Sequence, residues 1–502
     1  MKKITLYNPQ GDLIYWKKGN PPLPLLAISS ILDKEGYEIE IYDYRQKEEA
    51  VENASEALCV GITCMTGYQI HDGLIFAKML KKRYPEIPIC WGGRHPTLLP
   101  RQTISNEFVD ILVRGQGERT FAEVVKTLEG RGGLSKVLGI AYKKGDEIIF
   151  NPERPFEDVN NFPPLPYHLL DIEKYVARTR LGKRTIGYIT SMGCPFHCGF
   201  CAEQSVFGRK WSALTAPRVI EDMRNLVLKY NVDSIILSDS NFFVNEKRVR
   251  DICEGIKELG IPWGQVNGRT DTLARYKPET WRIMQESGLQ YILSGAESGL
   301  DECLEIIQKD ASVQDTFEFT RIAKKYGVRI QFSLFIGAPS LERKYSVEDE
   351  FKSTLEMIYQ LHKINKDSEF LLFLYAPYPG TPLYEVSKQL GFKEPAKFEE
   401  WGNFDLNERH IPWVPDKYAR LSLDITYYLF IISGSLHRTI NNYPLFIRAV
   451  LTIMATPIYF VVLLRFKYKL FTAPFDVWLI RIILKAKNNI QEISLAWTKR
   501  NV

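Results

Sequence analysis

Apolar residues in the first 150 positions fall into short runs and longer amphipathic stretches that alternate along the chain. The short runs end in small or polar residues and predict strands, whereas the amphipathic stretches predict helices. Because strands that alternate with helices form parallel sheets, we predict a doubly wound, Rossmann-like α/β domain over residues 1–150, with ligands beyond the carboxyl ends of its strands. The predicted strands are Ile4–Tyr7, Tyr37–Tyr42, Ala57–Thr63, Ile87–Trp91 and Asp110–Val113, and the predicted helices are Leu23–Leu32 and Ile70–Arg83.

The same alternation returns after a proline-rich segment. Several prolines and little periodicity predict a linker over residues 151–185. Six further strand patterns, separated by helical stretches, predict a complete or partial TIM-like barrel over residues 186–395. Active sites in such barrels lie at the carboxyl ends of the strands. The predicted strands are Thr185–Thr190, Ser234–Leu237, Trp263–Val266, Tyr291–Leu293, Arg329–Phe335 and Phe370–Tyr375, and the helices include Pro217–Tyr230 and Lys247–Leu259.

Residues 396–502 predict a mostly helical region that contains two uncharged apolar runs, Ile425–Leu436 and Ala449–Leu464. The longer run is short of the roughly 20 residues that cross a bilayer, and Pro457 interrupts it. Three interpretations stay open: helices packed on the barrel, a helix on a membrane surface, and a true span. Basic residues beside the runs would favour an anionic membrane surface. They are Arg438, Arg448, Arg465, Lys467, Lys469, Arg481, Lys485 and Lys487.

Composition narrows the class of protein. A chain of 502 residues suggests two to four domains. Its 65 basic and 60 acidic residues are close to balance, so charge gives no indication of nucleic-acid binding. The first residues alternate like a strand and show no secretory leader. Eight cysteines, three clustered and five scattered, do not resemble a disulfide framework, and they predict a cytoplasmic protein with a metal site.

The clustered cysteines are Cys194, Cys198 and Cys201, directly after a predicted strand. Thiolates are the usual ligands of iron–sulfur clusters, and this Cys-x3-Cys-x2-Cys spacing lets three of them reach one cluster. Three ligands for four irons leave one iron open to a substrate or cofactor. A zinc site would need a fourth ligand, and His197 within the loop is poorly placed to be one. The sequence therefore predicts a [4Fe-4S] cluster.

This motif, with Phe200 before the last cysteine, resembles that of the radical S-adenosylmethionine (SAM) superfamily. The resemblance implies that the open iron chelates SAM and that an electron, from a flavodoxin or ferredoxin type of donor, cleaves SAM. The resulting 5′-deoxyadenosyl radical removes hydrogen from an unactivated carbon. Later loops resemble the family's SAM contacts, with Arg269 facing the SAM carboxylate. A capped turn or a surface salt bridge is the alternative for any one of them. Besides Phe200 and Arg269, the residues are Asp239, Ser240, Asn241, Glu297, Ser298, Gly337 and Pro339.

Two glycine-containing segments of the first region, residues 91–97 and 114–120, resemble the cobalamin-binding domain of many radical SAM enzymes. Gln116 stands where that family usually has Glu. No histidine has Asp two residues before it, so we expect cobalamin without a histidine on cobalt, and His95 as a residue that orients its loop. A domain that has lost cobalamin and serves as a scaffold or lid is the alternative. The implied contacts are Thr63, Gly92, Gly93, His95, Pro96, Thr97, Gly115, Gly117 and Glu118.

Residues 375–382 extend the resemblance to the branch that contains the anaerobic magnesium-protoporphyrin monomethyl ester cyclase. The resemblance implies methylation or ring closure at an unactivated carbon. The apolar C-terminal runs predict a hydrophobic or lipid-like substrate, and the near-balanced charge predicts no nucleic-acid partner. Two alternatives remain. One is a radical SAM enzyme with structural or absent cobalamin, and the other is a non-catalytic, membrane-associated cluster protein. We expect a cytoplasmic location, with peripheral membrane contact left open.

Overall fold

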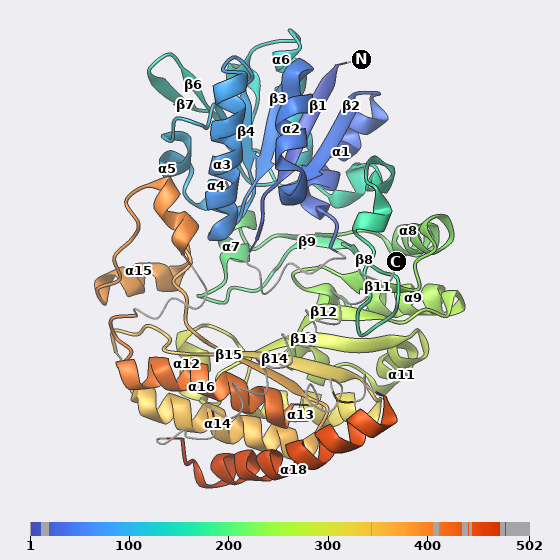
Figure 1. The fold of residues 1–502 in the computed structure, drawn as a ribbon, viewed down its shortest axis with the longest axis vertical. Coiled ribbons are helices and arrows are strands. Elements are labelled where there is room, and N and C mark those ends of the chain that lie inside the picture. The colour runs from blue at the N-terminus through green and yellow to red at the C-terminus, as the bar shows by residue number, and fades with distance from the viewer. Residues whose placement is uncertain are drawn as a thin grey trace.

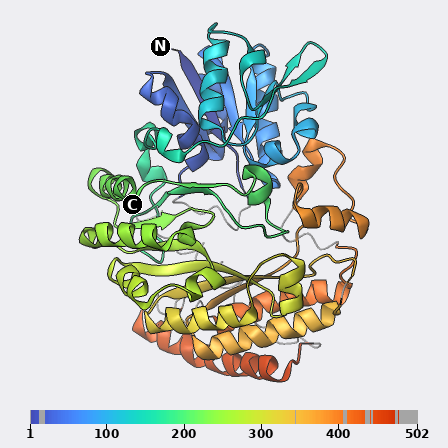
Figure 2. The ribbon, with the colours of Figure 1, turned by 180° about the vertical axis from the view of Figure 1, so that it is seen from behind.

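The computed structural model describes residues 2–11, 20–342, 344–404, 411–433, 440, 444–471 and 477. Along the long axis lie an N-terminal α/β domain, a second parallel sheet with its helices, and a group of C-terminal helices at the far end (Figure 1). The chain after the second sheet returns to the first domain, as the orange ribbon in Figure 2 shows from behind. A hydrogen bond from Gly67 N–H to Trp401 O joins the returning chain to the first domain, and one from Leu383 N–H to Gly199 O joins it to the loop after β9 (Ser191–Gly193).

The first domain contains a seven-stranded sheet in the order β2-β1-β3-β4-β5-β6-β7. The first five strands are parallel, as predicted, and β6 and β7 form an antiparallel hairpin that the sequence analysis missed. The strands are β1 Lys3–Asn8, β2 Glu38–Asp43, β3 Ala57–Thr63, β4 Ile89–Gly92, β5 Ile111–Val113, β6 Ile140–Lys144 and β7 Glu147–Phe150. The helices are α1 Leu23–Lys34, α2 Lys47–Asn53, α3 Tyr68–Arg83, α4 Arg94–Leu98, α5 Pro100–Ile104 and α6 Glu118–Leu128.

The second sheet has six parallel strands in the order β15-β14-β13-β12-β11-β8. Because β8 and β15 form its two edges, the sheet is a partial barrel. All six predicted strands form: β8 Thr185–Tyr188, β11 Ser234–Leu237, β12 Trp263–Arg269, β13 Leu289–Glu297, β14 Arg329–Ile336 and β15 Glu369–Leu374. The helices are α7 Ala202–Phe207, α8 Ala216–Tyr230, α9 Glu246–Ile256, α10 Thr270–Ala274, α11 Pro278–Glu286, α12 Asp301–Ile306, α13 Val313–Lys325 and α14 Val347–Ile364.

Helices cover the outer side of the partial barrel at the C-terminal end. After α15 (Pro382–Gln389) and a short 3-10 helix at Phe398–Asn403, α16 (Asp416–Ile432) packs on β15. Helix α18 (Leu445–Tyr468) then packs against α14 and α16, with Val462 and Phe466 buried. Figure 1 shows α18 as the outermost helix at that end of the molecule.

The sequence expectation for α18 is wrong in one respect. Pro457 lies inside a continuous helix of 24 residues, so the apolar run is neither interrupted nor too short to cross a bilayer. A proline removes one backbone hydrogen bond, and the helix tolerates that loss here. Of the basic residues beside the run, Arg438, Arg481, Lys485 and Lys487 lie outside the described residues.

Candidate active site

The three clustered cysteines lie in the loop between the short strand β9 (Ser191–Gly193) and helix α7. β9 pairs with β10 (Trp211–Ala213), so an antiparallel pair brackets the loop. Gly193 turns the chain with φ +79°, and a side chain there would meet Lys210 O at 2.2 Å. Beyond the turn, Gly199 donates its N–H to Ile307 O at 2.8 Å. The backbone therefore holds the loop without using the thiols.

The donor set fits an iron–sulfur cluster better than a single metal ion. Within the described residues, no three His, Cys, Asp or Glu side chains are grouped closely enough to hold one metal ion. A four-iron cluster binds each thiolate through a different iron and does not need such convergence. Burial raises the pKa of the Cys201 thiol to about 12. Its thiolate therefore needs the positive charge that bound iron supplies.

Three of the predicted SAM residues flank this loop. Asn241 Nδ2 lies 4.0 Å from Cys194 Sγ, and Arg269 Nη1 lies 3.2 Å from Cys198 Sγ. Glu297, at the end of β13, is buried and paired with Lys309 at 2.7 Å. The partial barrel thus brings strand ends that are far apart in sequence to the cysteine loop.

Other predicted SAM residues serve the fold itself. Asp239 is fully buried and accepts hydrogen bonds from Thr190 N at 3.0 Å, from Thr190 Oγ1 at 2.7 Å, and from Ser191. Ser298 accepts from Leu300 N–H at 3.2 Å, as a turn cap does. For Asp239 and Ser298 the geometry favours the alternative of a structural turn, because Asp239 already accepts from Thr190 and Ser191 and Ser298 from the Leu300 N–H.

The remaining predicted SAM residues lie in three places. Ser240 faces the first domain, where Arg94 Nη2 is 3.5 Å from its hydroxyl. Gly337 donates its N–H to Glu350 at 3.1 Å and accepts from Trp413 Nε1 at 2.9 Å, and Pro339 beside it is buried. Phe200 packs edge-on against the ring of Phe335, at 5.2 Å between centroids.

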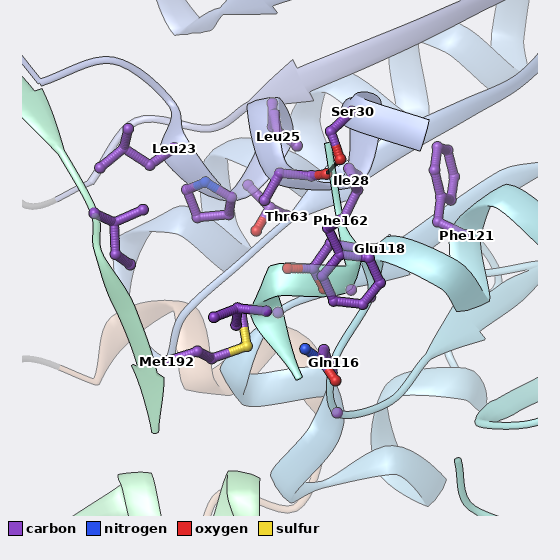
Figure 3. Close-up of a pocket in the computed structure, with 18 of the residues that line it drawn as sticks. Leu23, Leu25, Ile28, Ser30, Thr63, Gln116, Glu118, Phe121, Phe162 and Met192 are labelled. Atoms are coloured by element: carbon purple, nitrogen blue, oxygen red, sulfur yellow. Dashed lines mark hydrogen bonds between the residues drawn. The ribbon is translucent and has the colours of Figure 1, made fainter. Parts of the chain in front are cut away.

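A cavity of about 370 Å³ lies between the first domain and the cysteine loop. Its walls come from α1, the carboxyl ends of β3 and β4, the start of α6, the linker, and residues 189–193 that lead into the loop. In Figure 3, Thr63, Glu118 and Phe162 surround the cavity, and Met192 faces it from β9 of the short β9–β10 pair. The cavity therefore joins the two predicted cofactor regions.

Six of the nine residues implied for cobalamin line this cavity, namely Thr63, Gly92, Gly93, Gly115, Gly117 and Glu118. His95, Pro96 and Thr97 do not. Thr97 Oγ1 instead joins the two glycine turns, because it accepts from Gly115 N at 2.9 Å and donates to Gly93 O at 2.8 Å.

His95 is buried on the far side of its loop. Its Nδ1 is 3.0 Å from Thr66 Oγ1, and its ring packs against Phe398 and Trp401. Burial lowers the pKa of His95 to about 3, so the ring is neutral at ordinary pH. No histidine is among the described residues that line the cavity, and cobalt bound without a protein histidine stays a prediction.

Two carboxylate oxygens make the cavity suitable for a ligand with amide donors. Glu118 and Glu203 line it from opposite sides, and both are more than nine-tenths buried. Oε2 of each has no hydrogen-bond partner among the described residues. Such groups are costly unless a ligand or water satisfies them. The amide side chains of cobalamin are suitable donors, so the residues present fit that cofactor.

Glu118 should also make the stability of the cofactor-free protein depend on pH. Burial raises the pKa of Glu118 from 4.5 to about 7. The folded state then keeps a proton that the unfolded state loses, so stability falls as pH rises from about 4.5 to 7, by at most about 3 kcal/mol. We expect Glu118→Gln to lack this part of the decrease, measured by urea unfolding of both proteins from pH 5 to 8. Parallel pH profiles for the two proteins would contradict the prediction.

Sequence reasoning missed several residues of the site. Arg94 forms an ion pair with Glu203 across the edge of the cavity, and Lys309 reaches Glu297 from the turn after α12. Arg94 stood inside a segment already singled out, so its neighbours could have suggested it. Nothing in the local sequence distinguishes Glu203 or Lys309 from the surface charges nearby.

The comparisons with known proteins agree with this geometry. Residues 17–125 match the B12 binding domain, and residues 188–343 match the radical SAM superfamily. An uncharacterized methyltransferase of Pyrococcus horikoshii is 31% identical over 400 residues, which cover 77% of this chain and 83% of that protein. The anaerobic magnesium-protoporphyrin IX monomethyl ester cyclase of Cereibacter sphaeroides is 27% identical over 59% of this chain, and the match spans 47% of that protein.

The fold agrees with a solved structure as well. The cobalamin-dependent S-adenosylmethionine radical enzyme OxsB, with aqua-cobalamin and SAM bound, has a TM-score of 0.72 at 17% identity. The match covers 98% of this chain and 75% of that one. With both domain types present, and a relative above 30% identity over most of the chain, the predicted family and fold are confirmed. The protein belongs to the cobalamin-binding radical SAM enzymes, which use a [4Fe-4S] cluster, SAM and cobalamin.

Proposed function

We propose that this enzyme methylates an unactivated carbon of a hydrophobic substrate. The observation that carries the proposal is the cavity between the domains. The glycine turns implied for cobalamin form one wall, and the opposite wall is the strand that leads directly into Cys194. A substrate carbon placed there would lie between the two cofactors. When bound, the cluster with SAM supplies hydrogen abstraction and cobalamin supplies methyl transfer.

The chain's own residues bind and orient these groups. Cys194, Cys198 and Cys201 would hold the cluster, while Asn241 and Glu297 lie where they can contact SAM. Glycines after β4 and β5, with the carboxylates of Glu118 and Glu203, would hold cobalamin. A reductant of the flavodoxin or ferredoxin type would deliver the electron.

The walls of the cavity support a hydrophobic substrate. About half of the residues that line the cavity are aliphatic, aromatic or thioether residues from both domains, and the rest are glycines, two cysteines and twelve polar or charged residues. Apolar walls favour apolar ligands, and the polar groups orient them. A comparison of two relatives supports methylation over ring closure. The relative from Pyrococcus horikoshii, which matches 77% of this chain, is named a methyltransferase, and the cyclase matches only 59%.

The test of this function starts with a comparison of metabolites, because the sequence and the fold do not identify the substrate. A strain that lacks the gene should accumulate a compound with one CH₂ unit less than the wild-type product. Anaerobic incubation of that compound with reconstituted enzyme, SAM, cobalamin and a reductant should restore the missing unit and release S-adenosylhomocysteine together with 5′-deoxyadenosine. Loss of hydrogen without S-adenosylhomocysteine would indicate ring closure, and unconsumed SAM would reject both reactions.

We further propose that α18 holds the enzyme on the cytoplasmic surface of an anionic membrane. The helix is apolar enough to cross a membrane, yet only 6% of its most apolar window is buried. Leu445, Phe446 and Ile453 are exposed by 77%, 80% and 72%. Arg448 and Lys467 lie on the same helix as these apolar residues. Contiguous apolar surface next to basic residues is typical of interfacial helices.

Liposome flotation tests this contact. Phe446→Ser with Ile453→Ser should weaken binding to anionic vesicles at least about tenfold, because each buried apolar side chain contributes roughly 1.5–3 kcal/mol. Leu228→Ser on α8 is the matched control, since Leu228 is 74% exposed far from α18 in sequence. Substitution is preferable to truncation near Asn407, which would also remove α16 from β15. Equal binding of all three proteins, or none to anionic vesicles, would contradict the proposal.

A further inference from the structure

A turn far from the cysteine loop in sequence supports that loop. This turn, residues 307–310, follows α12. It accepts the Gly199 N–H and places Asp310 at 3.3 Å from the His197 ring. Gln308 and Asp310 have φ values of +53° and +52°, which non-glycine residues seldom adopt. Such conformations persist only where the surrounding structure maintains them, and they are often found at functional sites.

Lys309 projects from this turn into the interior. Its Nζ lies 2.7 Å from Glu297 Oε1, and both side chains are only 7% exposed. Its ammonium also lies 5.6 Å from the centre of the Phe200 ring, which belongs to the cysteine loop. A buried ion pair is an expensive way to stabilise a fold. Its position beside the cluster motif suggests a role in the chemistry there.

Arg269 connects Lys309 to the cysteines. Its guanidinium donates to Asp271 at 2.9 Å, to Cys198 Sγ at 3.2 Å, and to the carbonyl oxygen of Lys309. The Phe196 ring lies 4.0 Å from the guanidinium carbon and covers it. Three of its N–H groups are therefore occupied by protein atoms, and one of them points at a ligand sulfur. The expected contact of Arg269 with the SAM carboxylate stays a prediction.

Charges beside the cysteine sulfurs affect how readily the cluster accepts an electron. A hydrogen bond to a ligating sulfur, and a positive charge near it, stabilise the added electron of a reduced cluster. Glu297 and Asp271 balance the two cations, but neither carboxylate is hydrogen-bonded to a cysteine sulfur in the described structure. The donor that reaches Cys198 is the guanidinium.

We propose that Arg269 and Lys309 act as positioning residues that set the reduction potential of the cluster, making it easier to reduce. Arg269 acts through its hydrogen bond to Cys198, and Lys309 acts through its ammonium group, which pairs with Glu297 and lies beside Phe200 of the cysteine loop. The inference rests on the cluster of the proposed function but not on its substrate or on cobalamin.

The test measures the midpoint potential of the cluster by redox titration, followed by electron paramagnetic resonance, without SAM or cobalamin. Arg269→Gln and Lys309→Met should keep their iron but become reduced only at more negative potentials. Arg269→Lys, which keeps the charge, should shift less. Arg180→Gln is the control for loss of an Arg–carboxylate pair, because the exposed Arg180 lies 2.6 Å from the buried Glu369 at the first residue of β15.

Each outcome decides the matter. An unchanged potential in Arg269→Gln, or an equal shift in Arg180→Gln, would overturn the proposal. Loss of iron from Arg269→Gln would show a purely structural role and would overturn it as well. Wild-type protein without a cluster would instead refute the proposed function, so the two failures are distinguishable.

Discussion

Replacing Cys194, Cys198 and Cys201 together with alanine should abolish reductive cleavage of SAM and leave the fold intact. No other described residues are grouped to hold metal, so the variant has no replacement ligands. The loop should persist because backbone hydrogen bonds hold it, from Gly199 N–H to Ile307 O and from Leu383 N–H to Gly199 O. The measurements are iron content and 5′-deoxyadenosine formed under anaerobic, reducing conditions, and both should fall to background.

A matched control separates ligand loss from thiol loss. Cys253 is fully buried on α9, away from the loop. Its replacement by alanine removes one sulfur from the core, which should cost about 1–2 kcal/mol of stability and leave iron and SAM cleavage unchanged. If the triple variant still formed 5′-deoxyadenosine, the assignment of the cluster would be wrong.

Most strands could be predicted because each is a short apolar run bounded by polar or glycine residues, as Ser234–Leu237 illustrates. The hairpin of β6 and β7 was missed although Gly145 and Asp146 separate two apolar runs there. Pro457 misled the prediction of α18, since one lost hydrogen bond does not outweigh the rest of a 24-residue helix. Local pattern therefore predicts elements well, but not how long an apolar helix continues past a proline.

The site was predictable only where a motif carries it. The three cysteines lie within eight residues, so their spacing identifies them, and the glycine turns were identified by their resemblance to the cobalamin-binding domain. Glu203, Arg94 and Lys309 find their partners across long stretches of chain, and only the fold brings the pairs together. The contact between Arg269 and Cys198 could not be predicted for the same reason, because it depends on how the end of β12 lies against the cysteine loop.

Replacing Gly93 with valine should expel cobalamin while the cluster stays. Gly93 has φ +110°, and a Cβ there would lie 2.5 Å from Cys64 O and 3.0 Å from Cys64 N. Those atoms belong to the chain just after β3, which also forms the cavity wall. Strain of this kind costs roughly 1–2 kcal/mol even before the clash. Relief of the clash must separate the ends of β3 and β4, so we expect affinity for cobalamin to fall at least about tenfold.

Gly145→Val is the control for strain alone. Gly145 also has positive φ, at +59°, but a Cβ there meets nothing within 4 Å, and it lies in the turn between β6 and β7. That variant should bind cobalamin normally, because its turn is not part of the cavity. Cobalamin is read from the absorption spectrum of anaerobically reconstituted protein and iron from chemical analysis of the same sample. Equal loss of iron and cobalamin from Gly93→Val would point to general unfolding. Normal cobalamin content in this variant would show that the Gly93 turn is not part of the cobalamin site.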